Sequence, residues 1–99
     1  MPRKTTPNKA DFGRAVQQLR AARGSTQEDL LNATSRRHLS RIEQGHQQPS
    51  IGIVESLAES LQIHPLTLLA AAYCPIGDSE ALQTLLQTVQ DDFSALAGD

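Results

Sequence analysis

The fold is decided by the stretch TQEDLLNATSRRHLSRIEQG, residues 26–45. Its second half predicts a helix from Ser35 to Glu43, because Ser35 or the threonine before it can cap a helix and a glycine follows its end. Leu39 and Ile42 are the only strongly apolar residues of this helix. Such a thin apolar edge leaves most of the helix polar, and packing alone does not explain the three arginines that it carries.

The first half of the same stretch predicts a shorter helix from Thr26 to about Ala33. Thr26 followed three residues later by Asp29 approximates a capping box. The two leucines after Asp29 are expected to enter the core. The turn to the next helix contains no glycine, but Asn32 is a residue type that can adopt a left-handed conformation there.

Apolar residues at helical spacing predict four further helices around this pair. They cover residues 11–23, 51–61, 65–73 and 78–97. Gly24 is placed to end the first of them, and Pro65 suits a first turn, with His64 in the cap position. No strand alternation and no internal repeat is visible, so the predicted fold class is all-α.

The last predicted helix carries a nearly continuous apolar stripe. Its members are Leu82, Leu85, Leu86, Val89, Phe93 and Leu96. The stripe can fold back onto its own bundle or pack against a second subunit. The preceding helices already supply a core, which favours the second subunit and makes these six residues the predicted dimer interface.

Charge is divided unevenly along the chain. All nine Lys and Arg residues and four of the eleven acids lie in positions 1–50. Positions 51–99 hold the other seven acids and no Lys or Arg. The net charge of −2 therefore conceals a basic half suited to a polyanion and an acidic half kept away from it.

Several classes of protein are disfavoured by the sequence. No apolar run reaches the roughly 20 residues of a membrane span, and no hydrophobic stretch follows the basic start as in a secretory signal. One cysteine, Cys74, cannot form an internal disulfide and fits a reducing, cytoplasmic location. The three histidines and Cys74 match no zinc spacing, and no catalytic pair is visible. We therefore expect no metal, no cofactor and no enzymatic activity.

Five segments in order resemble the lambda-repressor-like (Cro/repressor, or XRE) helix-turn-helix family over residues 12–69. They are LRAARG (19–24), TQEDL (26–30), LSRIEQG (39–45), PS (49–50) and LAESLQIHP (57–65). The resemblance implies a five-helix bundle that docks on the DNA major groove, here followed by the amphipathic helix. Compared with this sequence, the family usually has two more residues between its second and third helices, including a glycine. The predicted organisation is a flexible basic arm (1–9), a helix-turn-helix domain (10–74) and a dimerisation helix (78–97).

The resemblance also assigns candidate DNA contacts. In this fold the third helix reads base edges, and arginine can donate twice to guanine. The base-reading candidates are Ser35, Arg36, Arg37, Ser40 and Arg41. The phosphate candidates are Gln27, Arg14, Arg23, His38, Gln44 and His46, with Arg3 and Lys4 of the arm. Arg41 can instead pair with Glu43 or contact a phosphate, and Glu43 is expected to tie its helix to the following loop.

These features predict a homodimeric regulator that binds double-stranded DNA in a sequence-specific manner. They favour a repressor over an activator, and the predicted operator is palindromic. The alternative is an antitoxin-like or adaptor module that uses the same fold to hold a protein partner. The apolar last helix would then be the contact surface. A salt-dependent DNA-binding assay distinguishes the two.

Overall fold

The computed structural model describes residues 9–98, and the basic arm predicted at the N-terminus lies almost wholly outside them. Its elements are α1 (Phe12–Arg23), the 3-10 helix η1 (Gln27–Leu30), α2 (Arg36–Glu43), α3 (Ile51–Leu61), α4 (Pro65–Tyr73) and α5 (Ser79–Leu96). Within residues 9–98 there is no strand, so the all-α prediction is confirmed. None of the helices there is both long and apolar enough to cross a membrane.

Local capping explains where the helices begin and end. Ser35 and Ser50 accept hydrogen bonds from the backbone N–H of His38 and Ile53, as serine N-caps do. His64 caps α4 by accepting from the Leu66 N–H at 3.0 Å. Gly24 ends α1 with φ 67°, a left-handed conformation that glycine adopts without strain.

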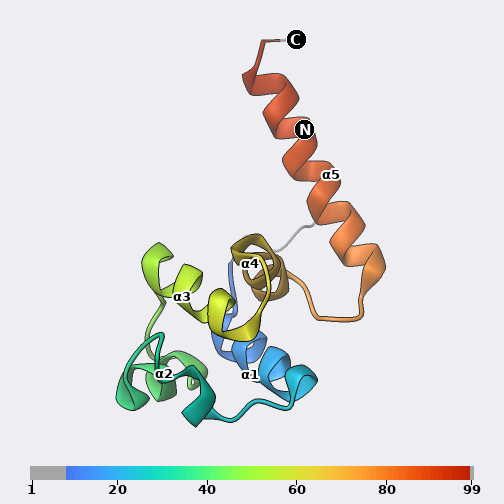
Figure 1. Ribbon diagram of the computed structural model, residues 1–99. Coiled ribbons are helices and arrows are strands. Elements are labelled where there is room, and N and C mark those ends of the chain that lie inside the picture. The colour runs from blue at the N-terminus through green and yellow to red at the C-terminus, as the bar shows by residue number, and fades with distance from the viewer. Residues whose placement is uncertain (1–8, 99) are drawn as a thin grey trace.

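Apolar side chains from five of the elements meet in one core. The fully buried large members are Val16, Leu30, Leu39, Ile42, Val54, Leu57, Leu61 and Leu68. α1 lies centrally and packs against α4 and α2, and α3 packs against α4 (Figure 1). The two apolar residues of α2 are both in this core, so the thin apolar edge predicted for that helix is confirmed.

α1 and the end of α2 approach each other backbone to backbone at Gly13. A Cβ placed on Gly13 would lie 2.7 Å from the Glu43 carbonyl oxygen and 2.9 Å from that of Ile42. Only glycine permits such an approach, since real Cβ atoms do not come this close to other atoms. The glycine therefore fixes how closely α2 can lie on α1.

The element before α2 differs from its prediction. The expected α-helix to about Ala33 is a 3-10 helix that ends at Leu30, followed by turns, and Leu31 is only half-buried. Asn32 is not left-handed, because Gln62 is the only non-glycine residue with positive φ among residues 9–98. With the connection shortened, a tighter 3-10 turn takes the place of a regular helix.

α5 extends away from the bundle and gives the molecule its long dimension of 45 Å, against 25 and 24 Å across (Figure 1). No residue of α5 is buried. The expectation that α5 does not fold back onto its own bundle therefore agrees with the structure. Five of the six residues of its apolar stripe are exposed, and the sixth, Leu85, is half-buried.

Candidate DNA-binding surface

The outer face of α2 gathers four of the predicted contact residues. Ser35, Arg37, His38 and Arg41 line a shallow depression of about 250 Å³ together with Gln47 from the following loop. The Arg41 Nε donates to the Gln47 side-chain oxygen at 3.2 Å, so Arg41 does not pair with Glu43. The depression is open, polar and flanked by two guanidinium groups, which suits an anionic or hydrogen-bonding ligand.

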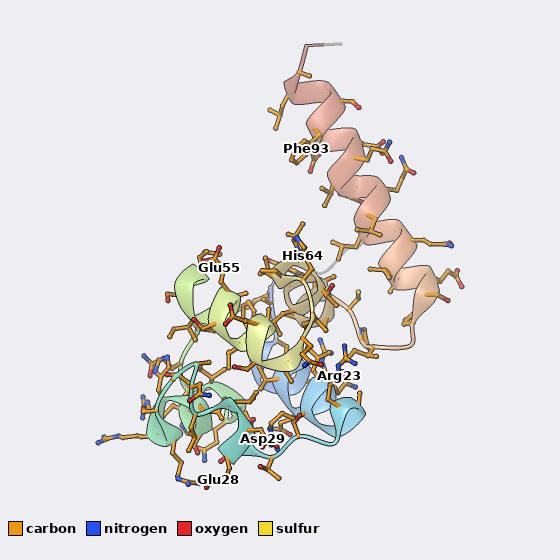
Figure 2. The ribbon with its side chains drawn as sticks, in the orientation of Figure 1. Arg23, Glu28, Asp29, Glu55, His64 and Phe93 are labelled. Carbon is orange, nitrogen blue, oxygen red and sulfur yellow. The ribbon has the colours of Figure 1, made fainter. Side chains whose placement is uncertain are left out.

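Arg36 and Arg37, adjacent in the sequence, have different surroundings. Arg36 forms an ion pair with Glu28 of η1, and both side chains are more than half exposed. Glu28 and the neighbouring Asp29 both belong to η1 (Figure 2). Arg37 lines the depression instead. The structure therefore separates the two candidates into one paired arginine and one that borders the open face.

Beneath this face, Glu43 anchors α2 to the two preceding elements. Its carboxylate accepts from the Arg20 Nε at 2.7 Å and from a second Arg20 nitrogen at 2.9 Å, a bidentate pair. It also accepts from the Gln27 side-chain amide at 2.9 Å. The Gln17 amide donates to the Glu43 backbone carbonyl at 2.9 Å. The Glu43 side chain is only 6% exposed.

The Arg20–Glu43 pair perturbs the ionisation of Arg20. Hydrogen bonding to Glu43 raises the pKa of Arg20 against the opposing effect of burial, and the carboxylate charge adds to the rise. Glu43 was expected to tie α2 to the following loop, and this was wrong: its partners lie on α1 and η1. Arg20 was not among the predicted site residues, because nothing in the sequence links positions 20 and 43.

Gln27 is the first residue of η1. Its amide nitrogen is engaged by Glu43. Gln27 therefore connects η1 to α2 and holds together the two elements that form the turn.

The remaining phosphate candidates are not gathered on α2. Arg14 donates to the Gln18 side chain at 2.8 Å and to the Ala72 carbonyl at 3.2 Å, which ties it to α1 and α4. Arg23 donates to the Gln62 carbonyl at 3.2 Å and lies exposed at the end of α1 (Figure 2). Gln44 and His46 are exposed directly after α2. Arg3 and Lys4 lie outside the described residues.

No group of three His, Cys, Asp or Glu side chains within residues 9–98 is arranged to hold a metal ion. Cys74 is buried and donates its thiol to the Ala70 carbonyl. It lies at the C-terminal end of α4, as the C-cap residue of that helix.

The arrangement of η1 and α2 on a helical bundle is that of a helix-turn-helix protein. A family model described as "Helix-turn-helix domain" matches residues 11–72. The chain belongs to this XRE-like family of DNA-binding transcription regulators, as its sequence resemblance implied. Members of this class are regulators and not enzymes, in agreement with the prediction of no enzymatic activity.

Two solved structures are similar to the chain. One is the restriction-modification controller protein C.AhdI from Aeromonas hydrophila, with 33% identity and a TM-score of 0.55, covering 60% of this chain and 92% of that protein. The other is the clp gene regulator ClgR from Corynebacterium glutamicum, with 26% identity and a TM-score of 0.59, covering 88% of this chain and 86% of that protein. Among curated proteins no match was found.

Proposed function

We propose that this protein is a homodimeric, sequence-specific regulator, acting as a repressor, that places α2 in the major groove of a palindromic operator. The observation that carries the proposal is the exposed face of α2, where Arg37 and Arg41 flank an open polar depression. The helix that presents them is anchored from beneath by Glu43, whose carboxylate accepts from Arg20 and Gln27. A cytoplasmic location is part of the proposal.

The similar proteins support a regulatory role. One is the controller protein of a restriction-modification system, and the other is a regulator of clp genes. The unequal charge supports DNA as the ligand, because every Lys and Arg lies in positions 1–50 with the helix-turn-helix. Base contacts are assigned to Ser35, Arg37, Ser40 and Arg41, with Arg36 after release from Glu28. Phosphate contacts are assigned to Gln27, His38, Gln44 and His46, and less directly to Arg14 and Arg23.

The dimer is proposed to form through α5. Five of its large apolar side chains are exposed, from 37% for Leu82 to 86% for Leu96. Contiguous apolar surface of this kind marks an interaction site. A two-fold pair of subunits would present two reading helices to half-sites about one DNA turn apart.

Selection of bound sequences from a random pool of duplex DNA tests the function. We expect an inverted repeat to be enriched, and its affinity to fall with salt by a slope of about −0.9 per phosphate contacted. A pool that yields no enriched sequence would contradict sequence-specific binding. Enrichment of a single unrepeated half-site would contradict the palindromic operator but not sequence-specific binding.

A variant pair ties the function to α2. Arg37→Ala should relax selection at one position of each half-site, because each lost bidentate contact removes about 1–3 kcal/mol of discrimination. Arg14→Ala is the matched control, because it also removes one arginine. Arg14 is tied to α1 and α4 and is assigned to a phosphate, so its loss should leave the selected sequence unchanged.

A protein partner is the second candidate, and the exposed stripe of α5 is the observation that favours it. In an antitoxin-like or adaptor module this stripe would hold a different protein. A chain that stays monomeric alone and binds no DNA in the selection would favour this alternative.

A further inference from the structure

An apolar groove opens beside the start of α5. It has a volume of about 300 Å³ and lies between the end of α1, α4 and the linker to α5. Small or apolar side chains line it, among them Leu19, Ala22, Ala70, Ala71, Cys74 and Leu82. Leu82 is also the first member of the exposed α5 stripe, so the groove and the stripe form one continuous apolar surface.

We propose that this groove receives the C-terminal end of α5, with Phe93 and Leu96, from a second copy of the chain. The inference rests on the proposed dimer and specifies how its two subunits are arranged. The two α5 helices would lie antiparallel, and each would end in the groove of the other subunit.

The spacing of the stripe fits antiparallel pairing. Seven residues before Val89 is Leu82 and seven after it is Leu96; four before it is Leu85 and four after it is Phe93. A two-fold axis at Val89 therefore brings Leu96 of one copy to Leu82 of the other. Leu86 is the one stripe residue without an apolar counterpart in this register. A two-fold interface requires such reciprocal contacts.

The position of the groove fits the same arrangement. Leu82 and Leu96 are separated by about 21 Å along the helix at 1.5 Å per residue. Phe93 lies on the part of α5 that extends beyond the bundle, and it is 73% exposed (Figure 2). Its own groove lies at the other end of the helix, so only an antiparallel partner delivers Phe93 and Leu96 to it. A parallel pair would leave the groove open.

The exposed area of the stripe is too small to form a stable dimer interface by itself. If a fully exposed large side chain presents about 150 Å², the five exposed α5 side chains supply roughly 450 Å². A specific interface buries about 800 Å² on each partner. Pairing of the stripes alone is therefore small for a stable dimer, and the adjoining groove provides further apolar surface on each subunit.

Cross-linking between differently marked chains tests the arrangement. One chain carries Ala22→Cys and the other Leu96→Cys, each with Cys74→Ala to remove the native thiol. After subunit exchange, a short bismaleimide should join position 22 of one chain to position 96 of the other, as mapped by mass spectrometry. Ser94→Cys, a near-isosteric change outside the stripe, replaces Leu96→Cys in the control and should give at least fivefold less product.

The possible outcomes test the groove proposal and the dimer proposal separately. The mass of the assembly is measured by light scattering on the same samples. A dimer that yields no more 22–96 product than the 22–94 control overturns the groove proposal and leaves the dimer intact. Dominant 96–96 linkage in the Leu96→Cys chain alone means parallel pairing and also overturns it. A monomeric mass at all concentrations overturns both proposals.

A groove variant provides a second measurement that needs no cross-link. Ala22 is exposed at the groove wall, so Ala22→Glu should leave the bundle folded, as judged by circular dichroism, while weakening dimerisation at least tenfold. Ala21→Glu places the same charge on the neighbouring exposed residue outside the groove and should change dimerisation less than threefold. Equal effects of the two variants would overturn the proposal.

Discussion

α2 and α5 are both amphipathic helices at the surface, but they differ in what fixes them. α2 has eight residues and buries Leu39, Ile42 and the carboxylate of Glu43 within its own chain. α5 has eighteen residues and buries none. The shorter helix is anchored on one side and presents the other, whereas the longer one has an apolar face without a partner in its own chain.

The difference indicates two separate tasks. In the proposed function α2 must hold its side chains in place before it meets DNA, and the bidentate Arg20–Glu43 pair anchors it within one chain. In the proposed dimer α5 acquires its anchor only in the assembly. Changes beneath α2 should therefore affect folding of the single chain, and changes on α5 should affect only assembly.

The largest effect is expected from Leu86→Asp on α5. A two-fold interface would bury two added carboxylates, so the dimer dissociation constant should rise about 1000-fold, which corresponds to roughly 4 kcal/mol. Analytical ultracentrifugation measures this constant. Gln83→Asp, on the polar side of the same helix, is the matched control and should change it less than threefold. An unchanged mass for Leu86→Asp would show that the stripe is not the interface.

Glu43→Ala tests the anchor of α2. It removes the carboxylate that accepts from Arg20 and Gln27, and breaking a buried ion pair costs about 3 kcal/mol. Urea unfolding of the monomeric Leu86→Asp background measures this loss without a contribution from dimerisation. Glu55→Ala removes an exposed carboxylate from α3 (Figure 2) and should change the free energy of unfolding by less than about 0.5 kcal/mol. Equal losses in the two variants would contradict the anchoring role.

Most of the helices could be predicted because their signals are local. Ser50 and Pro65 are strong start signals, and α3 and α4 begin directly at them. The class of the candidate site followed from the same information, since α2 has only two apolar residues and three arginines. These features depend on neighbours within one or two turns, which the sequence displays directly.

What the sequence did not show depends on contacts between distant residues. The Arg20–Glu43 pair joins positions 23 residues apart, and many other pairings of the same charges were equally compatible with the sequence. The 3-10 form of η1 follows from how α1 and α2 constrain a short connection, not from its capping residues. The separation of Arg36 from Arg37 likewise depends on Glu28 across the turn.

Gly13→Ala tests the close approach of α1 and α2. The added Cβ would meet the Glu43 and Ile42 carbonyl oxygens below 3 Å, so the helices must separate, at a cost of about 2 kcal/mol. Gly52→Ala is the matched control, because Gly52 also occupies the second position of its helix and a Cβ there meets only the Ser50 hydroxyl at 3.9 Å. That control should stabilise the protein by about 0.5 kcal/mol. Stabilisation by both substitutions would mean that α2 does not depend on this contact.

The smallest effect on folding is expected from Glu28→Gln. The Glu28–Arg36 pair is 60% and 58% exposed, and solvent screening leaves such pairs worth less than about 1 kcal/mol. Its loss should therefore lower the free energy of unfolding by at most about 0.5 kcal/mol, while DNA affinity rises severalfold because a negative charge disappears and Arg36 is released. Glu59→Gln, an exposed carboxylate on α3, should change neither quantity. A loss above 2 kcal/mol in urea unfolding would mean that this exposed pair, and not the Glu43 cluster alone, holds α2 against the bundle.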